Sequence, residues 1–218
     1  IGEIRADIEK INLSFQEKAI LLTSLLYAID KAANTCGHYD AFRKCLDTVE
    51  PIKLFTPFIN QELNVSNEVY NDDANKLIRE IKADILYIDP PYNSRQYSDT
   101  YHLLENIISW KKPVVYGKAK KMDRNNIKSR YCTKEAPKAF YDLVMNAKCN
   151  HILVSYNNMS EKGNMRSNAR IKDCEIIEAL EKRGKLEIRE QKYKPFTTGK
   201  SITEGHSERV FVCKVIDK

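Results

Sequence analysis

The sequence has no hydrophobic segment long enough to cross a membrane. A helical span needs about 20 consecutive apolar residues, and the longest apolar-rich run, residues 19–29, is interrupted by Thr23 and Ser24. The first ten residues carry charges of both signs without a hydrophobic block, so the pattern of a secretory signal peptide is missing as well. These absences predict a cytoplasmic protein without a membrane partner.

Closely spaced cysteines are also missing. The six cysteines stand at positions 36, 45, 132, 149, 174 and 213, and no two of them form a C-x-x-C pair. Structural zinc sites and redox motifs normally contain such pairs. Cys36 and His38 are close enough in sequence to share an ion, but no second pair completes a site. We therefore expect reduced cysteines and no metal centre.

Positive charge is unevenly distributed along the chain. Residues 111–130 contain eight basic residues and one acid, an excess larger than the net charge of +6 for the whole chain. A solvated loop would explain such a run, but Lys and Arg also neutralise phosphates and release counterions. We interpret the run as a phosphate-facing surface. Its candidate contacts are Lys118, Lys120, Lys121 and Arg124.

The first 64 residues have the pattern of helices joined by loops. Ser14 and Glu17 are spaced as a capping box, and apolar residues then recur at helical spacing to about Ala32. A second helical piece is predicted over residues 40–46. Because no strand-like alternation occurs here, we assign residues 1–64 to a helical region and residues 65–218 to an α/β region.

Strands and helices alternate in the second region. Two short apolar runs, residues 84–89 and 151–156, are typical of strands buried on both faces of a parallel sheet. The remaining predicted strands are residues 68–70, 186–188 and 210–212, and the predicted helices are residues 74–81, 100–110, 137–148 and 171–182, the last closed by Gly184. This alternation predicts a mostly parallel, doubly wound α/β sheet. The length suits one ordinary domain, or one domain with a sizeable insertion.

The tetrapeptide Asp89-Pro90-Pro91-Tyr92 comes at the end of one buried strand, where ligands of such sheets bind. An aromatic amino group is a poor nucleophile, because its lone pair is delocalised into the ring, and a hydrogen-bond acceptor on its hydrogens helps it attack a methyl donor. Asp89 and the carbonyl of Pro90 are suitable acceptors, which the prolines hold in place. Tyr92 offers a face on which an extruded base can stack. The alternative is a simple strand-ending turn.

A second acidic site precedes this strand. Asp73 lies 16 residues before Asp89, after the predicted strand 68–70. A carboxylate there can accept a hydrogen bond from the amino group of a bound adenine. Asp73 is our first choice for this role and Asp72 the second, with Ala74 beside them. The run also fits a helix N-cap, which either acid can provide.

These segments resemble a known family. The likeness to the Dam-like (alpha-group) N6-adenine DNA methyltransferases of bacterial restriction–modification systems lies in DPPYNSRQY (89–97), YHLLEN (101–106), ANTCGHY (33–39) and ILVSYN (152–157). It extends from about Ser14 to Cys213. The resemblance implies a Rossmann-like methyltransferase sheet, S-adenosylmethionine as methyl donor and a bacterial, cytoplasmic protein.

The resemblance also implies residue roles. Residues 89–92 would form the catalytic loop, Asp73 would meet the adenine of the cofactor, and the helical region 1–64 would contact DNA and help choose the target sequence. One family feature is missing: the seven glycines show no F-x-G-x-G loop, which holds the methionine end of the cofactor. We expect that loop and the first strands upstream of Ile1, which leaves a partial sheet and weak cofactor binding in this chain.

Further polar residues are candidates for nucleic-acid contacts. Those that follow the catalytic loop could meet a flipped nucleotide or a neighbouring phosphate, with plain loop structure as the alternative; they are Asn93, Arg95, Gln96 and Tyr97. Arg166, after the strand 151–156, could touch the DNA backbone.

The sequence therefore predicts a site-specific DNA adenine-N6 methyltransferase that acts on duplex DNA without a metal. The resemblance favours adenine over cytosine N4, because related enzymes that modify cytosine N4 more often have Ser at the position of Asp89. A cognate restriction endonuclease encoded nearby is the expected partner. Two alternatives stay open: an RNA adenine methyltransferase, and a non-catalytic DNA-binding subunit of a modification system. The recognition sequence does not follow from residue order.

Overall fold

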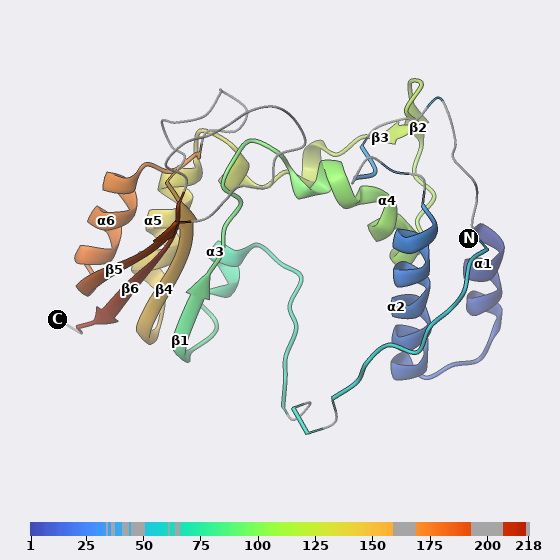
Figure 1. Ribbon diagram of the computed structural model, residues 1–218, viewed down its shortest axis with the longest axis horizontal. Helices are drawn as coiled ribbons and strands as arrows, with labels where there is room; N and C mark the ends of the chain where they lie inside the picture. Colours follow the sequence, from blue (N-terminus) through green and yellow to red (C-terminus); the bar gives the residue numbers. More distant parts are fainter. Residues whose placement is uncertain are drawn as a thin grey trace. The chain divides into compact units, whose positions relative to one another are not determined.

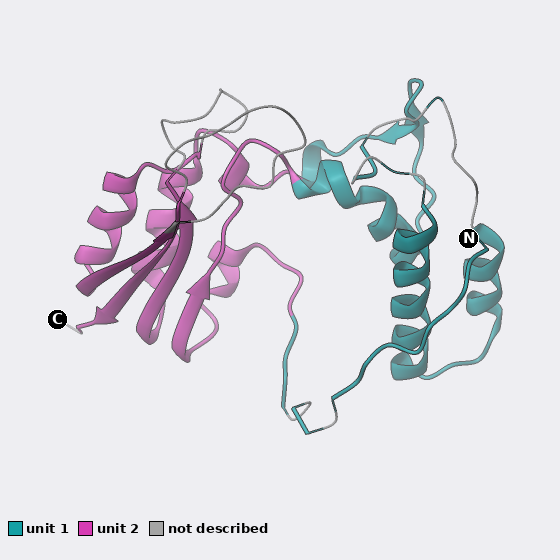
Figure 2. Cartoon of the chain, in the orientation of Figure 1, with its two compact units in different colours: residues 1–69, 97–127 teal, residues 70–96, 128–218 magenta. Residues whose placement is uncertain are grey.

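The computed structural model of the chain describes residues 1–33, 35, 38–40, 44, 51–60, 62–63, 66–158, 169–192 and 207–216 (Figure 1). Most of the predicted helix 40–46, and Arg166, lie outside these ranges. The chain divides into two compact units, residues 1–69 with 97–127 and residues 70–96 with 128–218 (Figure 2). Residues 97–127 thus belong to the first unit although they interrupt the second in sequence. Within the described ranges, no helix combines the length and the apolar character that a membrane span requires.

The first unit is helical with one small hairpin. Its elements are α1 (Gly2–Lys10), α2 (Phe15–Ala32), α4 (Tyr97–Ser109), the strands β2 (Val115–Tyr116) and β3 (Lys121–Met122), and the 3-10 turn η1 (Asn125–Ile127). Ile8, Leu25 and Ile29 form its buried centre, against which Leu104 and Ile107 of α4 pack. The apolar stripe predicted for α2 therefore faces this small core.

The predicted capping box begins α2. The backbone N–H of Ser14 donates to Glu17 Oε2 at 2.8 Å, and the N–H of Glu17 donates to Ser14 Oγ at 3.3 Å, which satisfies two helix-end donors. Helix α1 was not predicted, because its buried face includes Arg5. The Arg5 guanidinium donates to the carbonyls of Ile107 and Ile108 at 2.7 and 2.9 Å. A buried charge of this kind interrupts the apolar periodicity on which helix prediction relies.

The second unit is a four-stranded sheet with helices. Its elements are α3 (Ala74–Leu77), β1 (Ala83–Ile88), the 3-10 turn η2 (Arg130–Cys132), α5 (Ala136–Asn146), β4 (Cys149–Asn157), α6 (Asp173–Glu181), β5 (Gly184–Lys192) and β6 (Ser207–Val215). The strand order is β1-β4-β6-β5. β1 and β4 are parallel, and β6 is antiparallel to both of its neighbours. Strands β1, β4 and β5 therefore run in one direction and β6 in the other.

The sheet differs from the predicted one in two respects. It is mixed, because β6 is antiparallel to both of its neighbours, β4 and β5. It is also not doubly wound within the described residues, since α5 and α6 pack on the same face. In chain order, β1, β4 and β5 are placed progressively further toward the same edge of the sheet. Right-handed crossovers that all move toward one edge place their helices on one face of the sheet.

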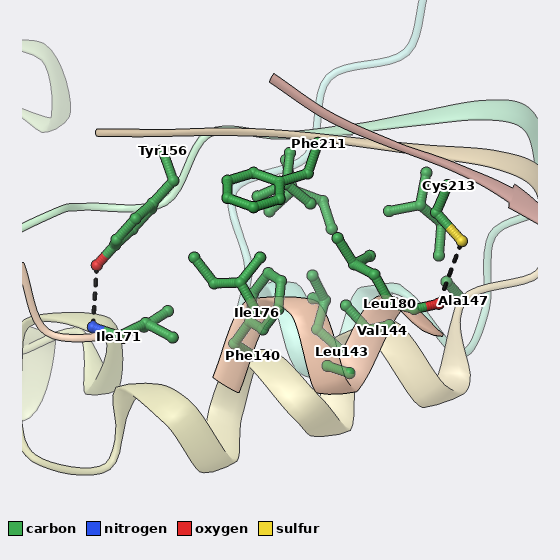
Figure 3. Close-up of a cluster of buried hydrophobic side chains, with 14 of the residues drawn as sticks. Phe140, Leu143, Val144, Ala147, Tyr156, Ile171, Ile176, Leu180, Phe211 and Cys213 are labelled. Atoms are coloured by element: carbon green, nitrogen blue, oxygen red, sulfur yellow. Dashed lines mark hydrogen bonds between the residues drawn. The ribbon is translucent and has the colours of Figure 1, made fainter. Parts of the chain in front are cut away.

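The core lies between this face of the sheet and the helices (Figure 3). Phe140 of α5, Leu180 of α6 and Phe211 of β6 are all buried in it. Each side chain of this size contributes roughly 1.5–3 kcal/mol by leaving water. On the opposite face of β1, Ile85 and Tyr87 are 61% and 59% exposed. The apolar run 84–88 is therefore buried on one face only in the described structure.

Two local predictions were wrong. Residues 68–70 form no strand; they have no regular secondary structure and lie outside both sheets, with Val69 95% exposed. Three residues without a ladder of hydrogen bonds are too few to hold a strand. Gly184 does not end α6, whose C-cap is Lys182, but begins β5. A Cβ at Gly184 would overlap the Lys214 carbonyl of β6, so the close approach of the two strands explains this glycine.

Candidate active site

The loop 89–92 leaves the carboxyl end of β1, as predicted. β1 pairs in parallel with β4, and Ile88 lies opposite Val154 in their register. The next residue of β4, Ser155, therefore stands beside the start of the loop. The loop occupies the edge of the sheet where parallel strands end, which is the usual ligand-binding edge of α/β sheets.

Two side chains of the loop contact each other. The hydroxyl of Tyr92 donates to Asp89 Oδ1 at 3.1 Å and lies 3.4 Å from Ser155 Oγ. Burial raises the pKa of Tyr92 to about 12, although the hydrogen bond with Ser155 acts in the opposite direction. The hydroxyl is therefore a neutral donor at physiological pH. Asp89 is exposed while Pro90 is buried, so the loop is anchored and its carboxylate faces solvent.

This arrangement holds a hydrogen-bond acceptor beside an aromatic ring. Tyr92 donates to one oxygen of the Asp89 carboxylate, and the other oxygen can accept from an amino group. The two prolines restrict the backbone on which both side chains stand, so little conformational freedom is lost when a ligand arrives. The loop is suited to orient a planar ring that carries an exocyclic amine.

Two residues of β4 that contact the loop were not predicted as site residues. Ser155 approaches the Tyr92 hydroxyl, and the ring of Tyr156 packs edge-on against that of Tyr92, with centroids 5.0 Å apart and planes at 76°. Both follow Val154, at the carboxyl end of the strand parallel to β1. Their position at that strand end was the available signal.

Asp73 is the N-cap of α3, one of the two roles considered for it. Its Oδ1 accepts from the backbone N–H groups of Asn75 and Lys76 at 2.9 and 3.2 Å. Its Oδ2 lies 3.8 Å from Arg130 Nη2. Asp72 is exposed, and its Oδ1 accepts from the N–H of Asp73 at 2.7 Å. Both carboxylates are thus fixed at the start of α3.

A polar network behind these acids joins α3 to α5. The buried Asn75 donates through Nδ2 to the carbonyl of Ala139 at 2.8 Å and to Asp142 Oδ2 at 2.7 Å, and accepts from the Tyr131 hydroxyl at 3.0 Å. Hydrogen bonds from Arg79, and then from Asn75, hold the pKa of Asp142 below its ordinary value. The network fixes the position of the α3 N-terminus.

The residues at the start of α3 fit the adenosine end of a nucleoside cofactor. The carboxylates of Asp72 and Asp73 can accept from amino or hydroxyl groups, and Ala74 adds only a small side chain beside them. The sequence supplies no glycine-rich turn for the other end of such a cofactor. In the described part of the chain, no three His, Cys, Asp or Glu side chains gather as a metal site would require.

The basic segment 111–130 contains the hairpin β2–β3 rather than a plain loop. Lys118 and Lys120 are exposed in its turn, where Gly117 and Lys120 have φ values of 66° and 49°. Glycine adopts this left-handed conformation at little cost. The turn therefore presents two of the four predicted phosphate contacts to solvent.

The other two, Lys121 and Arg124, form ion pairs inside the first unit. Lys121 Nζ lies 2.5 Å from Asp40 Oδ1, and Arg124 lies 3.3 Å from the same oxygen and 3.1 Å from Asp99 Oδ1. The side chain of Arg124 is only 15% exposed. Burial alone would raise the pKa of Asp40, but the hydrogen bonds and charges of Lys121 and Arg124 hold it below its ordinary value. These two cations connect the hairpin strand to neighbouring segments.

The residues that follow the loop 89–92 have contrasting surroundings. Asn93 Oδ1 accepts from the N–H of Arg95 at 2.9 Å, and the side chains of Arg95 and Tyr97 are exposed. Gln96 is 6% exposed, and its amide both donates to the carbonyl of Ser129 at 3.0 Å and accepts from the Ser129 N–H at 2.7 Å. Gln96 therefore joins two loops of the second unit.

Known proteins confirm the predicted family. The sequence model of the D12 class N6 adenine-specific DNA methyltransferases matches residues 1–168. The chain belongs to this family. The matched range includes both the loop 89–92 and the strand β4 that flanks it, so the match covers the site described above.

Curated relatives of this D12-class chain are larger proteins. It is 44% identical over 164 residues to modification methylase StsI of Streptococcus sanguinis, which is 71% of this chain and 25% of that protein. It is 44% identical over 143 residues to the type II methyltransferase M.FokI of Planomicrobium okeanokoites, 64% of this chain and 22% of that protein. Identity to M.NlaIII of Neisseria lactamica is 35% over 189 residues, 85% of this chain and 53% of that protein. No solved structure matches the chain significantly.

Proposed function

We propose that the protein containing this chain transfers a methyl group from S-adenosylmethionine to N6 of an adenine in duplex DNA, at one short recognition site. The supporting observation is Asp89: an exposed carboxylate on a proline-restricted loop, at the carboxyl end of a parallel strand, in a D12-class chain. Relatives named modification methylases add support.

Each residue of the loop 89–92 has a different part in orienting the base. Asp89 accepts a hydrogen bond from the 6-amino group, and the carbonyl of Pro90 accepts a second. The ring of Tyr92 stacks on the extruded adenine. When bound, the cofactor supplies an electrophilic methyl group. The methyl carbon would form its new bond to the amine nitrogen as its bond to sulfur breaks, with the electron pair of that bond remaining on the sulfur. Asp89 would stabilise the positive charge that develops on the nitrogen, and the nitrogen would then lose its proton to solvent.

The start of α3 holds the cofactor in this proposal. Asp73 would accept a hydrogen bond from the adenine amino group of the cofactor through Oδ2, and Asp72 would be the second acceptor. The N-cap bonds fix the Asp73 carboxylate before the ligand binds, and Ala74 leaves room beside it. Asp89 would complete the cofactor site on the side of the methyl group.

DNA contacts fall on the exposed cations and polar side chains. Lys118 and Lys120 in the hairpin turn contact phosphates, and Arg95, Tyr97 and Asn93 lie close to the flipped nucleotide. Residues 1–64 help to select the target sequence, and Arg166 touches the backbone. For Lys121, Arg124 and Gln96, the hydrogen bonds and ion pairs described above favour a structural role instead.

A restriction endonuclease that cuts the same sequence is the proposed partner. Relatives of the chain are named as modification and type II methyltransferases. Methylation of one site on the host DNA has a function when a nuclease recognises the same site, so the two activities would share one recognition sequence.

The proposal is tested by exposing unmodified DNA to the intact protein and to its Asp89→Ala variant, followed by modification-sensitive sequencing. We expect N6-methyladenine at one short motif with the intact protein and none with Asp89→Ala. If the intact protein binds S-adenosylmethionine but leaves duplex DNA unmodified, the DNA proposal fails. Methylation of single-stranded RNA in a parallel reaction would then identify the substrate.

A further inference from the structure

Tyr156 is buried directly behind the catalytic loop. It lies near the carboxyl end of β4 and is 0% exposed, with its ring on the helical side of the sheet (Figure 3). A phenol hydroxyl in such a place is costly unless both of its hydrogen-bonding capacities are used. The partners of this hydroxyl therefore show what it does.

Both capacities are used, and one partner is the loop itself. The hydroxyl donates to the carbonyl oxygen of Tyr92 at 3.2 Å. It accepts from the backbone N–H of Ile171 at 3.1 Å, the hydrogen bond drawn in Figure 3. The N–H of Arg170 donates to the same Tyr92 carbonyl at 2.7 Å. One phenol thus joins the last residue of the catalytic loop to the segment that leads into α6.

The ring of Tyr156 acts on the same residue. It meets the ring of Tyr92 edge to face at 5.0 Å, an arrangement that aromatic pairs favour. Tyr92 is therefore held at two points, through its backbone carbonyl and through its ring. Burial raises the pKa of Tyr156 to about 12, so the hydroxyl remains a donor over the whole range in which an enzyme would be assayed.

We infer that Tyr156 is a positioning residue: its hydroxyl fixes the backbone at Tyr92, so that the Tyr92 ring and the Asp89 carboxylate meet the target base in one geometry. Tyr156 touches neither base nor cofactor and acts through Tyr92. The inference rests on the proposed function, because it assigns Tyr156 a role in the same methyl transfer. Misplacement of a reacting group by about 1 Å can cost about 100-fold in rate, so loss of this hydroxyl should be visible in turnover.

The test is Tyr156→Phe in the intact protein, which removes the hydroxyl and keeps the ring. We expect the single-turnover methylation rate to fall about 10- to 100-fold, while the Kd values for DNA and S-adenosylmethionine stay within about threefold. The amide of Ile171 should exchange its hydrogen faster, because it loses its acceptor. Cys213→Ala is the matched control: Cys213 is also fully buried and donates to the Leu180 carbonyl, but it pairs with Ile152, four residues before Tyr156 on β4.

The outcomes separate the inference from the proposed function. A wild-type methylation rate in Tyr156→Phe, or an equal loss in Cys213→Ala, overturns the positioning role and leaves the methyltransferase proposal intact. If the wild-type protein methylates no DNA, the proposed function fails. Exchange at Ile171 then still decides whether the hydroxyl holds the segment, and unchanged exchange overturns the inference by itself.

Discussion

Replacing Arg124 with glutamine separates a structural role from a DNA-contact role in the basic segment 111–130. The guanidinium lies 3.1 Å from Asp99 Oδ1 and 3.3 Å from Asp40 Oδ1, so Arg124→Gln leaves two carboxylates without this cation. A hydrogen bond to a charged group contributes about 1.5–3 kcal/mol. Because both carboxylates are about one-third exposed, solvent screening reduces the expected loss of unfolding free energy to roughly 1–3 kcal/mol.

Lys118→Gln is the matched control for this prediction. Lys118 is exposed in the hairpin turn, so its replacement should change the unfolding free energy by less than about 0.5 kcal/mol. It should instead weaken DNA binding and reduce the slope of log K against log salt by about 0.9, the value for one phosphate contact. Urea unfolding and DNA binding at several salt concentrations measure both quantities for both variants. The structural assignment is refuted if Arg124→Gln keeps its stability and lowers the salt slope as Lys118→Gln does.

Three further predictions concern other contacts. Tyr92→Ala should lower methylation about 5- to 150-fold through lost base stacking, which contributes about 1–3 kcal/mol, in addition to the lost hydrogen bond to Asp89. Tyr92→Phe keeps the ring and loses only that hydrogen bond, so its loss should be smaller; equal losses in both would contradict a stacking role. The hydrogen bond from Arg79 lowers the pKa of Asp142, so the ionised carboxylate stabilises the fold above about pH 4, and this stabilisation is lost as the pH falls through the lowered pKa. Asp142→Asn should therefore reduce the fall in unfolding free energy between pH 7 and 3, measured by urea unfolding. An unchanged pH profile would contradict this. Arg5→Met removes the donor to two α4 carbonyls and should cost about 2–4 kcal/mol in thermal unfolding; an unchanged Tm would show that the buried guanidinium contributes nothing.

Local signals in the sequence were enough to predict much of the fold. Some elements depend only on residues that are neighbours in the chain, so their residue pattern identifies them. These are the Ser14–Glu17 capping box, the apolar run that forms β1, and the periodic helices α4, α5 and α6. Two features depend on the order of the strands in the sheet: the antiparallel direction of β6 and the packing of α5 and α6 on one face. A local residue pattern does not reveal that order. The exposed segment at Val69 illustrates the same limit, because a strand requires a neighbouring strand as well as residues of high β propensity.

The candidate site divides in a similar way. The loop 89–92 was predictable because its residue types, its prolines and its place after an apolar strand all agree. Ser155 and Tyr156 could not be assigned, since their contact with the loop depends on the parallel register of β1 and β4. Arg124 was predicted to bind phosphate from its charge alone, whereas the structure surrounds it with Asp40 and Asp99. A charge in a sequence does not reveal whether its partner lies inside the protein.

The chemical identity of the modified base tests the central claim most directly. The intact protein would be incubated with duplex DNA and S-adenosylmethionine carrying a deuterated methyl group, and the DNA then digested to nucleosides for mass spectrometry. The account predicts the label on N6 of deoxyadenosine, at a level that Asp89→Ala abolishes. Label on cytosine instead, or an Asp89→Ala variant as active as the wild type, would contradict the assignment of this loop as the adenine-N6 catalytic site.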